Sequence, residues 1–356
     1  MKSRLLVVGL GAFLAASIAQ AQLSPNVSVF VTGLNNPRGL KFGPDGFLYV
    51  AEGGLGGAST TVGVCDQVPA PVGPYTGGFT ARISRIDPQG NRSTVIDGLP
   101  SSQTAPASGS FVSGAADVAF LHHRMYALLA GAGCSHGLLN TSNQVIQIDP
   151  RRGTSTPVAD LSAFIADHPV AYPNPDDFEP DGTWWNLIAV DDQLYTTEPN
   201  HGEIDEVHLD GSVHRLVDIS ATHGHIVPTA LAFHERLYFG NLHLFPINIE
   251  AANVFEIQHE RRIRVAVPLL ATVLAIAFDA GGRMYILETS AANGMPTPGQ
   301  GKVLRADSTG HTIEIASGLT FPTGMAVGPD GQLYVSNFGF GFGEGAGQIM
   351  RITLPD

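Results

Sequence analysis

Short runs of apolar residues, interrupted by single polar residues and bounded by Gly, Pro or Asp, recur along this chain of 356 residues. Runs of this length and composition predict β-strands, and no long segment has the period of an amphipathic helix. One set of such runs comprises ISRID (83–87), VIQID (145–149), IDEVH (204–208), VFEIQ (254–258), VLRAD (303–307) and IMRIT (349–353).

A longer repeat contains these runs. Segment 33–52 reads GLNNPRGLKFGPDGFLYVAE, and segment 318–337 reads GLTFPTGMAVGPDGQLYVSN. Four weaker copies lie between them, and each copy has one tyrosine at the same position. These tyrosines are Tyr49, Tyr126, Tyr195, Tyr238, Tyr285 and Tyr334. Each repeat predicts an apolar strand, a tight turn, a Tyr-centred strand and two further strands.

Six repeats of four antiparallel strands predict an all-β fold, a six-bladed β-propeller. The chain ends on a third strand (349–353), and the unassigned run VSVFVTGL (27–34) resembles a fourth strand. We therefore expect the N-terminal strand to complete the last blade and close the ring, in one domain spanning 22–356. The alternative, an open solenoid, would leave two unpaired sheet edges.

Residues 1–21 have a positive start with Lys2 and Arg4, an apolar stretch and an Ala-Gln-Ala site. This pattern predicts a cleaved secretory signal peptide. We expect an exported protein, periplasmic or extracellular, without membrane insertion after cleavage.

The composition changes this picture little. Gly (42 residues) and Pro (24 residues) fit a chain with many turns, and the formal net charge is −13. Loss of the leader removes two positive charges, which leaves −15. An acidic chain without a basic field does not attract phosphate backbones, so nucleic acid is excluded as a partner. We expect a monomer.

The two cysteines, Cys65 and Cys134, lie in insertions after the second strand of the first and second repeats. An even number of cysteines in an oxidising compartment predicts a disulfide. The alternative is two buried free thiols.

Polar residues recur where the loops of one propeller face should meet. The position three residues after the repeat tyrosine holds Glu52, Leu129, Glu198, Asn241, Glu288 and Asn337. The first strands begin with Arg38, Ala116, Asn186, Thr229, Leu274 and Thr323. Three glutamates at one mouth could bind Ca²⁺ or Mg²⁺, or Zn²⁺ if histidines join them. Alternatively, these side chains cap backbone N–H groups, and Arg38 offsets one of the carboxylates.

Other candidates lie in the loops. His201, His223 and His225 are weak candidates for a general base or ligand, and the alternative is a polar loop. The adjacent Trp184 and Trp185 could form the wall of an aromatic ligand pocket at the channel mouth, with Trp185 as the ligand-binding candidate, or they could pack the preceding loop on the blade. The acidic run Asp176, Asp177, Glu179 and Asp181 is expected to be solvated.

Three segments resemble the ScyD/ScyE family of exported propellers, which is related to NHL-repeat proteins. They are GLNNPRGLKFGPDGFLYVAEGG, VPTALAF…LYFGNLHLFPINIEAANVFEI and GLTFPTGMAVGPDGQLYVSNFGFGFGEGAGQIMRI. The resemblance implies a six-bladed exported propeller and supplies no reaction. Segment 193–211, QLYTTEPNHGEIDEVHLDG, is similar to repeats of streptogramin-lyase-like propellers, which are metal-dependent enzymes.

Three functions remain open at this point. The first is binding of a small molecule or partner protein at the channel mouth, and the second is a metal-dependent lactonase- or lyase-like activity. The third is a role in assembly of the cell envelope. No Gly-x-Ser-x-Gly motif or catalytic cysteine context is present, so nucleophilic hydrolysis has no sequence support.

Overall fold

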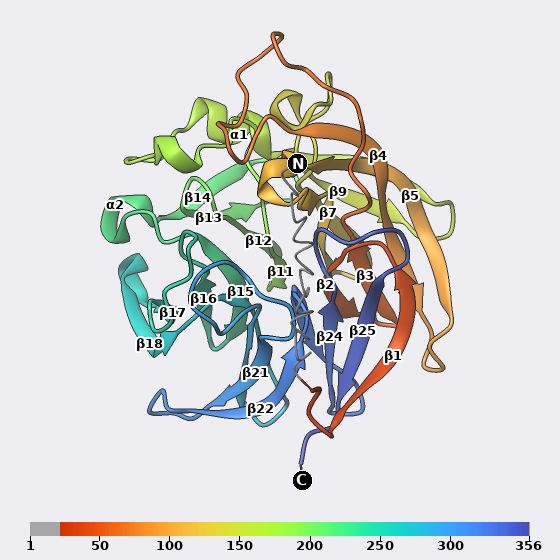
Figure 1. The fold of residues 1–356 in the computed structure, drawn as a ribbon, viewed down its shortest axis with the longest axis vertical. Coiled ribbons are helices and arrows are strands. Elements are labelled where there is room, and N and C mark those ends of the chain that lie inside the picture. The colour runs from red at the N-terminus through yellow and green to blue at the C-terminus, as the bar shows by residue number, and fades with distance from the viewer. Residues whose placement is uncertain (1–21, 356) are drawn as a thin grey trace, which may run out of the picture.

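The computed structural model describes residues 22–355, so the predicted signal peptide at 1–21 lies outside the described residues. Six antiparallel sheets are arranged around a central axis (Figure 1). The predicted all-β, six-bladed propeller is confirmed. The structure runs from an N-terminal strand, β1 (Val27–Leu34), through the six blades in chain order.

The first three blades carry most of the insertions. Blade one contains β2 (Pro37–Phe42), β3 (Leu48–Glu52), β4 (Thr76–Ile86), β5 (Arg92–Gln103) and a short fifth strand, β6 (Val112–Ser113). Blade two contains β7 (Ala115–Leu121), β8 (Arg124–Leu129), β9 (Gln144–Asp149) and β10 (Thr154–Asp160). Blade three contains β11 (Leu187–Val190), β12 (Gln193–Glu198), β13 (Glu203–Val207) and β14 (Val213–Asp218).

The last three blades are more regular. Blade four contains β15 (Pro228–His234), β16 (Arg236–Asn241), β17 (Ala252–Ile257) and β18 (Ile263–Leu270). Blade five contains β19 (Val273–Phe278), β20 (Met284–Glu288), β21 (Gly301–Ala306) and β22 (Thr312–Leu319). Blade six contains β23 (Gly324–Val327), β24 (Leu333–Asn337) and β25 (Gly347–Ile352), and β1 is its outer strand.

The ring closes through β1, as the sequence predicts. This strand pairs with β25 from Val27 opposite Ile352 to Leu34 opposite Gly347. Figure 1 shows the red β1 beside the blue β25. The pairing provides hydrogen-bond partners for the backbone groups at the outer edge of β25. It also joins the N-terminal and C-terminal strands of the described chain in one sheet.

The repeated tyrosine has a structural role in the turn of the blade. The Tyr49 hydroxyl donates to Asp45 Oδ2 at 2.9 Å, and Arg85 from the third strand binds the same carboxylate at 2.8 Å. Tyr334 bonds Asp330 at 3.1 Å in the same way, and Arg351 also binds that carboxylate. In blades one and six, this Tyr–Asp–Arg contact therefore stabilises the turn between the first and second strands.

The core lies between neighbouring blades. Leu40 and Val50 of blade one pack with Ala326 and Ile349 of blade six, and all four side chains are buried. Each blade thus buries both faces of its inner strands, which explains the near-continuous apolar runs in the sequence.

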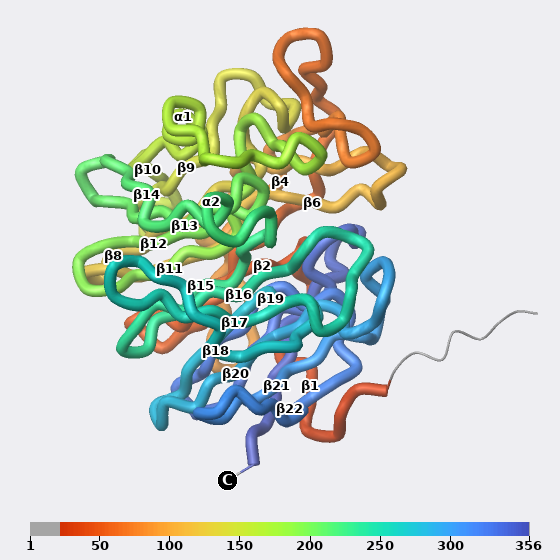
Figure 2. Tube along the Cα trace, turned by 90° about the vertical axis from the view of Figure 1, so that its left-hand side faces the viewer, coloured from red at the N-terminus to blue at the C-terminus, as the bar shows by residue number. Residues whose placement is uncertain are grey.

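Short helices lie in the loops between strands, most of them in or next to blades one to three and η4 in blade four. The helices are α1 (Leu161–Asp167), α2 (Ser220–His223), η1 (Pro106–Ser108), η2 (Cys134–His136), η3 (Pro175–Asp177) and η4 (His259–Arg261). Figure 2 shows the orange loop between β3 and β4 projecting beyond the blades. The predicted disulfide between Cys65 and Cys134 is confirmed, and it joins this loop to the one after β8. Within residues 22–355, no helix has the length and apolar run needed to cross a bilayer.

Candidate functional site

The first strands of the six blades surround the propeller axis, because each of them contacts the first strands of its two neighbours. At one end, the loops before these strands and after the second strands enclose a cavity of about 210 Å³. Four aromatic side chains line it, together with aliphatic groups from blades four and five. The aromatic residues are Phe111, Trp185, Phe245 and Phe340. We call this space the mouth cavity.

Arg38 is the basic residue of the mouth cavity. It begins β2 and is only 4% exposed. Its guanidinium carbon lies 4.1 Å from the centroid of the Trp185 ring, a cation–π distance. Nη1 donates to the Val112 carbonyl at 3.4 Å. Burial lowers the pKa of Arg38 to about 9, so the group is still a cation at neutral pH.

The channel narrows directly beneath the mouth cavity. Trp185 donates its indole N–H to the Leu274 carbonyl at 3.0 Å. Asp117 accepts from Asn186 Nδ2 at 2.5 Å and from the Leu187 N–H at 2.9 Å, and burial raises its pKa. A Cβ on Gly39 would lie 2.0 Å from Asp117 Oδ1. Only about 10 Å³ remains open here, about the lower limit for one water molecule, so the mouth cavity has a narrow floor.

The predicted ligand-binding residues separate into three groups. Arg38, Trp185 and Thr229 line the mouth cavity. Asn186 and Thr323 lie at the narrow floor, where Thr323 donates to the Pro37 carbonyl at 2.6 Å and links blades six and one. Asn241 and Asn337 are buried in backbone contacts and do not line the cavity.

The repeated position at the end of the second strand has a common structural role. In five of the six blades the side chain there accepts a hydrogen bond from a backbone N–H in or beside its own blade, and blade two has Leu129 instead. Glu52 accepts from Asn35 (2.6 Å), Glu198 from Thr183 (2.8 Å) and His201 (2.5 Å), Glu288 from Ala271 (2.5 Å), Asn337 from Thr320 (2.7 Å) and Asn241 from Asn253 (2.8 Å). The capping interpretation of these residues therefore agrees with the geometry.

The three glutamates do not fit a shared metal site. Each carboxylate already binds backbone donors, and two of them also bind a basic side chain. Glu52 pairs with Arg82 at 2.7 Å, and Glu288 lies 3.2 Å from Lys302 Nζ. Arg38 is not the partner of any of them, contrary to our expectation. Among residues 22–355, no group of three or more His, Cys, Asp or Glu residues is placed to hold a metal ion.

We expect Glu198→Ala to lower the free energy of unfolding by about 2–4 kcal/mol. The variant leaves the N–H groups of Thr183 and His201 without an acceptor in a buried site. Urea unfolding should give the same loss in EDTA and in CaCl₂. Glu344→Ala, at an exposed position, is the control. A loss that disappears in EDTA would contradict the capping role and support a metal at this position.

The three candidate histidines lie in different surroundings. His201 is buried, and its Nε2 bonds the Glu179 carbonyl at 2.9 Å. His225 bonds Asp177 at 2.7 Å, and Asp177 lines the mouth cavity. His223 is exposed at the end of α2, beside Phe255 and away from the cavity. The structure therefore does not bring these histidines together into one catalytic group.

The two adjacent tryptophans have different roles. Trp184 is fully buried in the core between blades two and three. Trp185 faces the mouth cavity. Trp184 therefore has the packing role, and whether Trp185 forms the wall of a ligand pocket stays a prediction.

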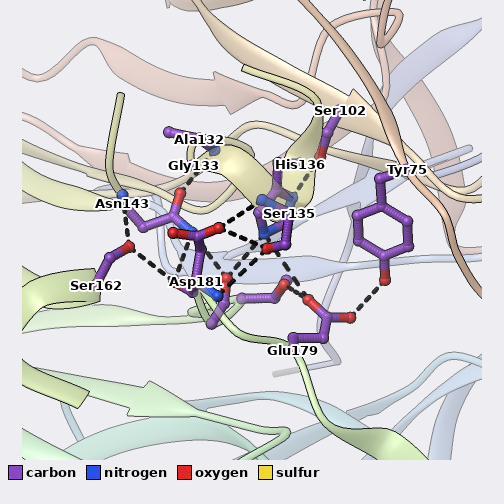
Figure 3. A network of polar contacts seen from close by, with 12 residues as sticks. Tyr75, Ser102, Ala132, Gly133, Ser135, His136, Asn143, Ser162, Glu179 and Asp181 are labelled. Atoms are coloured by element: carbon purple, nitrogen blue, oxygen red, sulfur yellow. Dashed lines mark hydrogen bonds and ion pairs between the residues drawn. The ribbon is translucent and has the colours of Figure 1, made fainter. Parts of the chain in front are cut away.

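A buried polar network supports the wall of the mouth cavity on the side of blades one to three (Figure 3). Tyr75 donates its hydroxyl to Glu179 Oε1 at 2.5 Å, and His136 Nε2 lies 3.9 Å from Glu179 Oε2. His136 donates from Nε2 to the Gly182 carbonyl at 3.0 Å. Its Nδ1 therefore accepts from the Ser102 hydroxyl at 2.8 Å. Burial lowers the pKa of His136, so the ring is neutral.

The expectation that the acidic run 176–181 is solvated is wrong for two of its members. Glu179 is 5% exposed, and burial raises its pKa to about 8. Asp181 accepts from the Ser135 N–H and hydroxyl, both at 2.6 Å. These contacts attach the loop 175–183 to blades one and two, and Asp177 and Thr183 of that loop line the mouth cavity.

Several lining residues were not predicted because they lie outside the repeat. Phe111 comes from the insertion before β7, Phe245 from the loop after β16 and Phe340 from the loop after β24. The signal available in the sequence was the aromatic content of these insertions, notably FGFGF (338–342) and HLFP (243–246).

Comparisons with known proteins identify the fold. No known family profile matches the sequence, and no curated protein matches it. A solved glucose dehydrogenase is 13% identical with a TM-score of 0.56, covering 93% of this chain and 100% of that one. A gluconolactonase from Xanthomonas campestris is 13% identical with a TM-score of 0.55, covering 92% and 89%. A streptogramin B lyase is 13% identical with a TM-score of 0.50, covering 92% and 97%.

The chain thus shares a propeller fold with these proteins, whose names indicate different activities. At this level of identity, the likeness concerns the fold alone.

Proposed function

We propose that this chain is an exported propeller of the ScyD/ScyE type that binds a small organic molecule non-covalently in the mouth cavity. The observation that carries the proposal is the cavity itself. It is concave, has a narrow floor, and combines aromatic walls with a few polar groups, which is the usual composition of a small-molecule site. The disulfide between Cys65 and Cys134 agrees with export to an oxidising compartment.

The alternative of a lactonase- or lyase-like enzyme has support only from the shared fold. Propellers of one architecture host unrelated functions. The glutamates predicted as metal ligands are engaged in backbone caps, and Glu52 and Glu288 also in ion pairs, so these carboxylates do not fit a shared metal ion.

The proposal predicts that Trp185→Ala weakens binding of a flat apolar probe at least tenfold, because the variant removes one wall of the cavity. Isothermal titration with 2-naphthamide, a neutral aromatic amide, measures this. Tyr172→Ala is the matched control, since Tyr172 is an aromatic residue 69% exposed outside the cavity. Absence of binding to the wild-type protein, or equal affinity in both variants, would refute binding in the mouth cavity.

A further inference from the structure

We propose that the mouth cavity selects ligands in which a carboxylate is attached to a flat apolar body, with Arg38 as the partner of the carboxylate. This inference rests on the proposed function and specifies its ligand class. Three observations carry it: the missing counter-ion of Arg38, the other charges of the cavity, and the shape of the walls.

Arg38 is a buried cation without an acidic partner. Within residues 22–355, no Asp or Glu oxygen lies within 4.0 Å of its nitrogens, whereas Arg82, Arg85 and Arg351 each bind a carboxylate. A guanidinium has five N–H donors, and only the long contact to Val112 uses one of them. A buried charge normally requires a paired and hydrogen-bonded partner. The unused donors of Arg38 belong to a side chain that lines the cavity, where a bound anion can reach them.

The other ionisable groups that line the mouth cavity, Asp177 and His243, do not occupy the guanidinium of Arg38. The Asp177 carboxylate is bonded to His225 Nε2 at 2.7 Å. His243 also lines the cavity, and burial lowers the pKa of its imidazole, so it is neutral at neutral pH. Arg38 is therefore a cation of this cavity that has no acidic partner among the described residues, although the chain as a whole carries a formal charge of −13.

The walls of the mouth cavity are mainly aromatic and aliphatic. They favour a ligand with a flat apolar body and a single anionic group. The Trp185 ring lies under the guanidinium, and Phe111 and Phe340 meet edge to face with ring centroids 5.2 Å apart. Aromatic walls favour a flat apolar body. A guanidinium matches the two oxygens of a carboxylate in a bidentate contact. A single cation suits a carboxylate better than a doubly charged phosphate.

The test compares 2-naphthoate with 2-naphthamide by isothermal titration, because the two probes differ mainly in charge. We expect the wild-type protein to bind the carboxylate roughly tenfold to a hundredfold more tightly than the amide. Arg38→Gln should remove this preference, and Arg38→Lys should retain part of it. Added NaCl should weaken binding of the carboxylate and leave the amide unchanged.

Arg305→Gln is the matched control, since Arg305 carries the same charge on β21 and does not line the mouth cavity. Thermal unfolding establishes that each variant is folded, and Arg38→Lys preserves the test if Arg38→Gln does not fold. Equal affinity of the wild-type protein for both probes would overturn the anion preference and leave the proposed function standing. Binding of neither probe would refute both. Tighter binding of 2-naphthyl phosphate than of 2-naphthoate would overturn the assignment of a carboxylate.

Discussion

Deletion of residues 22–34 is expected to abolish cooperative folding of the propeller. The deletion removes β1 and leaves β25 with an unpaired edge. It also removes two buried side chains, Val31 and Leu34, from the core between blades six and one. Burial of two aliphatic side chains and a strand of backbone hydrogen bonds contribute on the order of 6–10 kcal/mol. This loss is comparable to the whole stability of a typical domain.

Circular dichroism during heating measures this effect. Two single substitutions on the same strand provide a matched pair. Val31→Asp introduces a charge at a position 7% exposed, whereas Val29→Asp does so at a position 51% exposed. We expect the first to lower the melting temperature strongly and the second to change it little. A truncated chain that melts like the full one would show that β1 does not close the ring.

The second large effect concerns Glu179. Its carboxyl has a pKa of about 8 in the folded chain, against an ordinary value of 4.5, chiefly because it is buried. The unfolded chain therefore releases this proton near pH 4.5, whereas the folded chain keeps it up to about pH 8. The free energy of unfolding falls over this interval, by at most about 5 kcal/mol, and is constant above it.

Glu179→Gln should remove this pH dependence while keeping an acceptor for the Tyr75 hydroxyl. Wild-type and variant should have similar stability at pH 5, and the variant should be several kcal/mol more stable at pH 8. Urea unfolding at several pH values measures the difference. Glu203, whose pKa burial raises to about 7, contributes to both proteins and cancels in that difference.

Glu344→Gln, at an exposed position, is the control for loss of one carboxylate. Parallel pH profiles for wild-type protein and Glu179→Gln would contradict a carboxyl that is protonated at neutral pH. A pH effect would also reach the mouth cavity, because Thr183 bonds Glu179 and lines that cavity.

The fold was predictable because its information is local and repeated. The Tyr–Asp contact within a turn, seen for Tyr49 and Tyr334, needs residues four positions apart. The tyrosine recurs in six repeats, which gives the number of blades, and an aspartate four residues before it recurs in three of them, at Asp45, Asp191 and Asp330. The role of β1 could be predicted by counting strands, because the last blade would otherwise lack its outer strand and have an unpaired edge.

The candidate site was predictable only in part. The repeat identified the face, and with it Arg38, Trp185 and Thr229. The same repeat suggested a ring of glutamates, but backbone caps occupy those carboxylates. The aromatic walls come from insertions without a repeat, so their positions follow from tertiary contacts that one sequence does not reveal.

The sequence by itself therefore determined the six-bladed ring, its closure by β1 and the pairing of Cys65 with Cys134. These features depend on period, strand count and neighbouring loops. Tertiary structure alone decided which polar groups are free. Glu52 and Arg38 both carry a charge at the same mouth, but Glu52 is paired with Arg82 and Arg38 has no acidic partner among the described residues. Whether a buried charge is satisfied depends on neighbours distant in the chain, and that distinction separates a structural residue from a candidate binding residue.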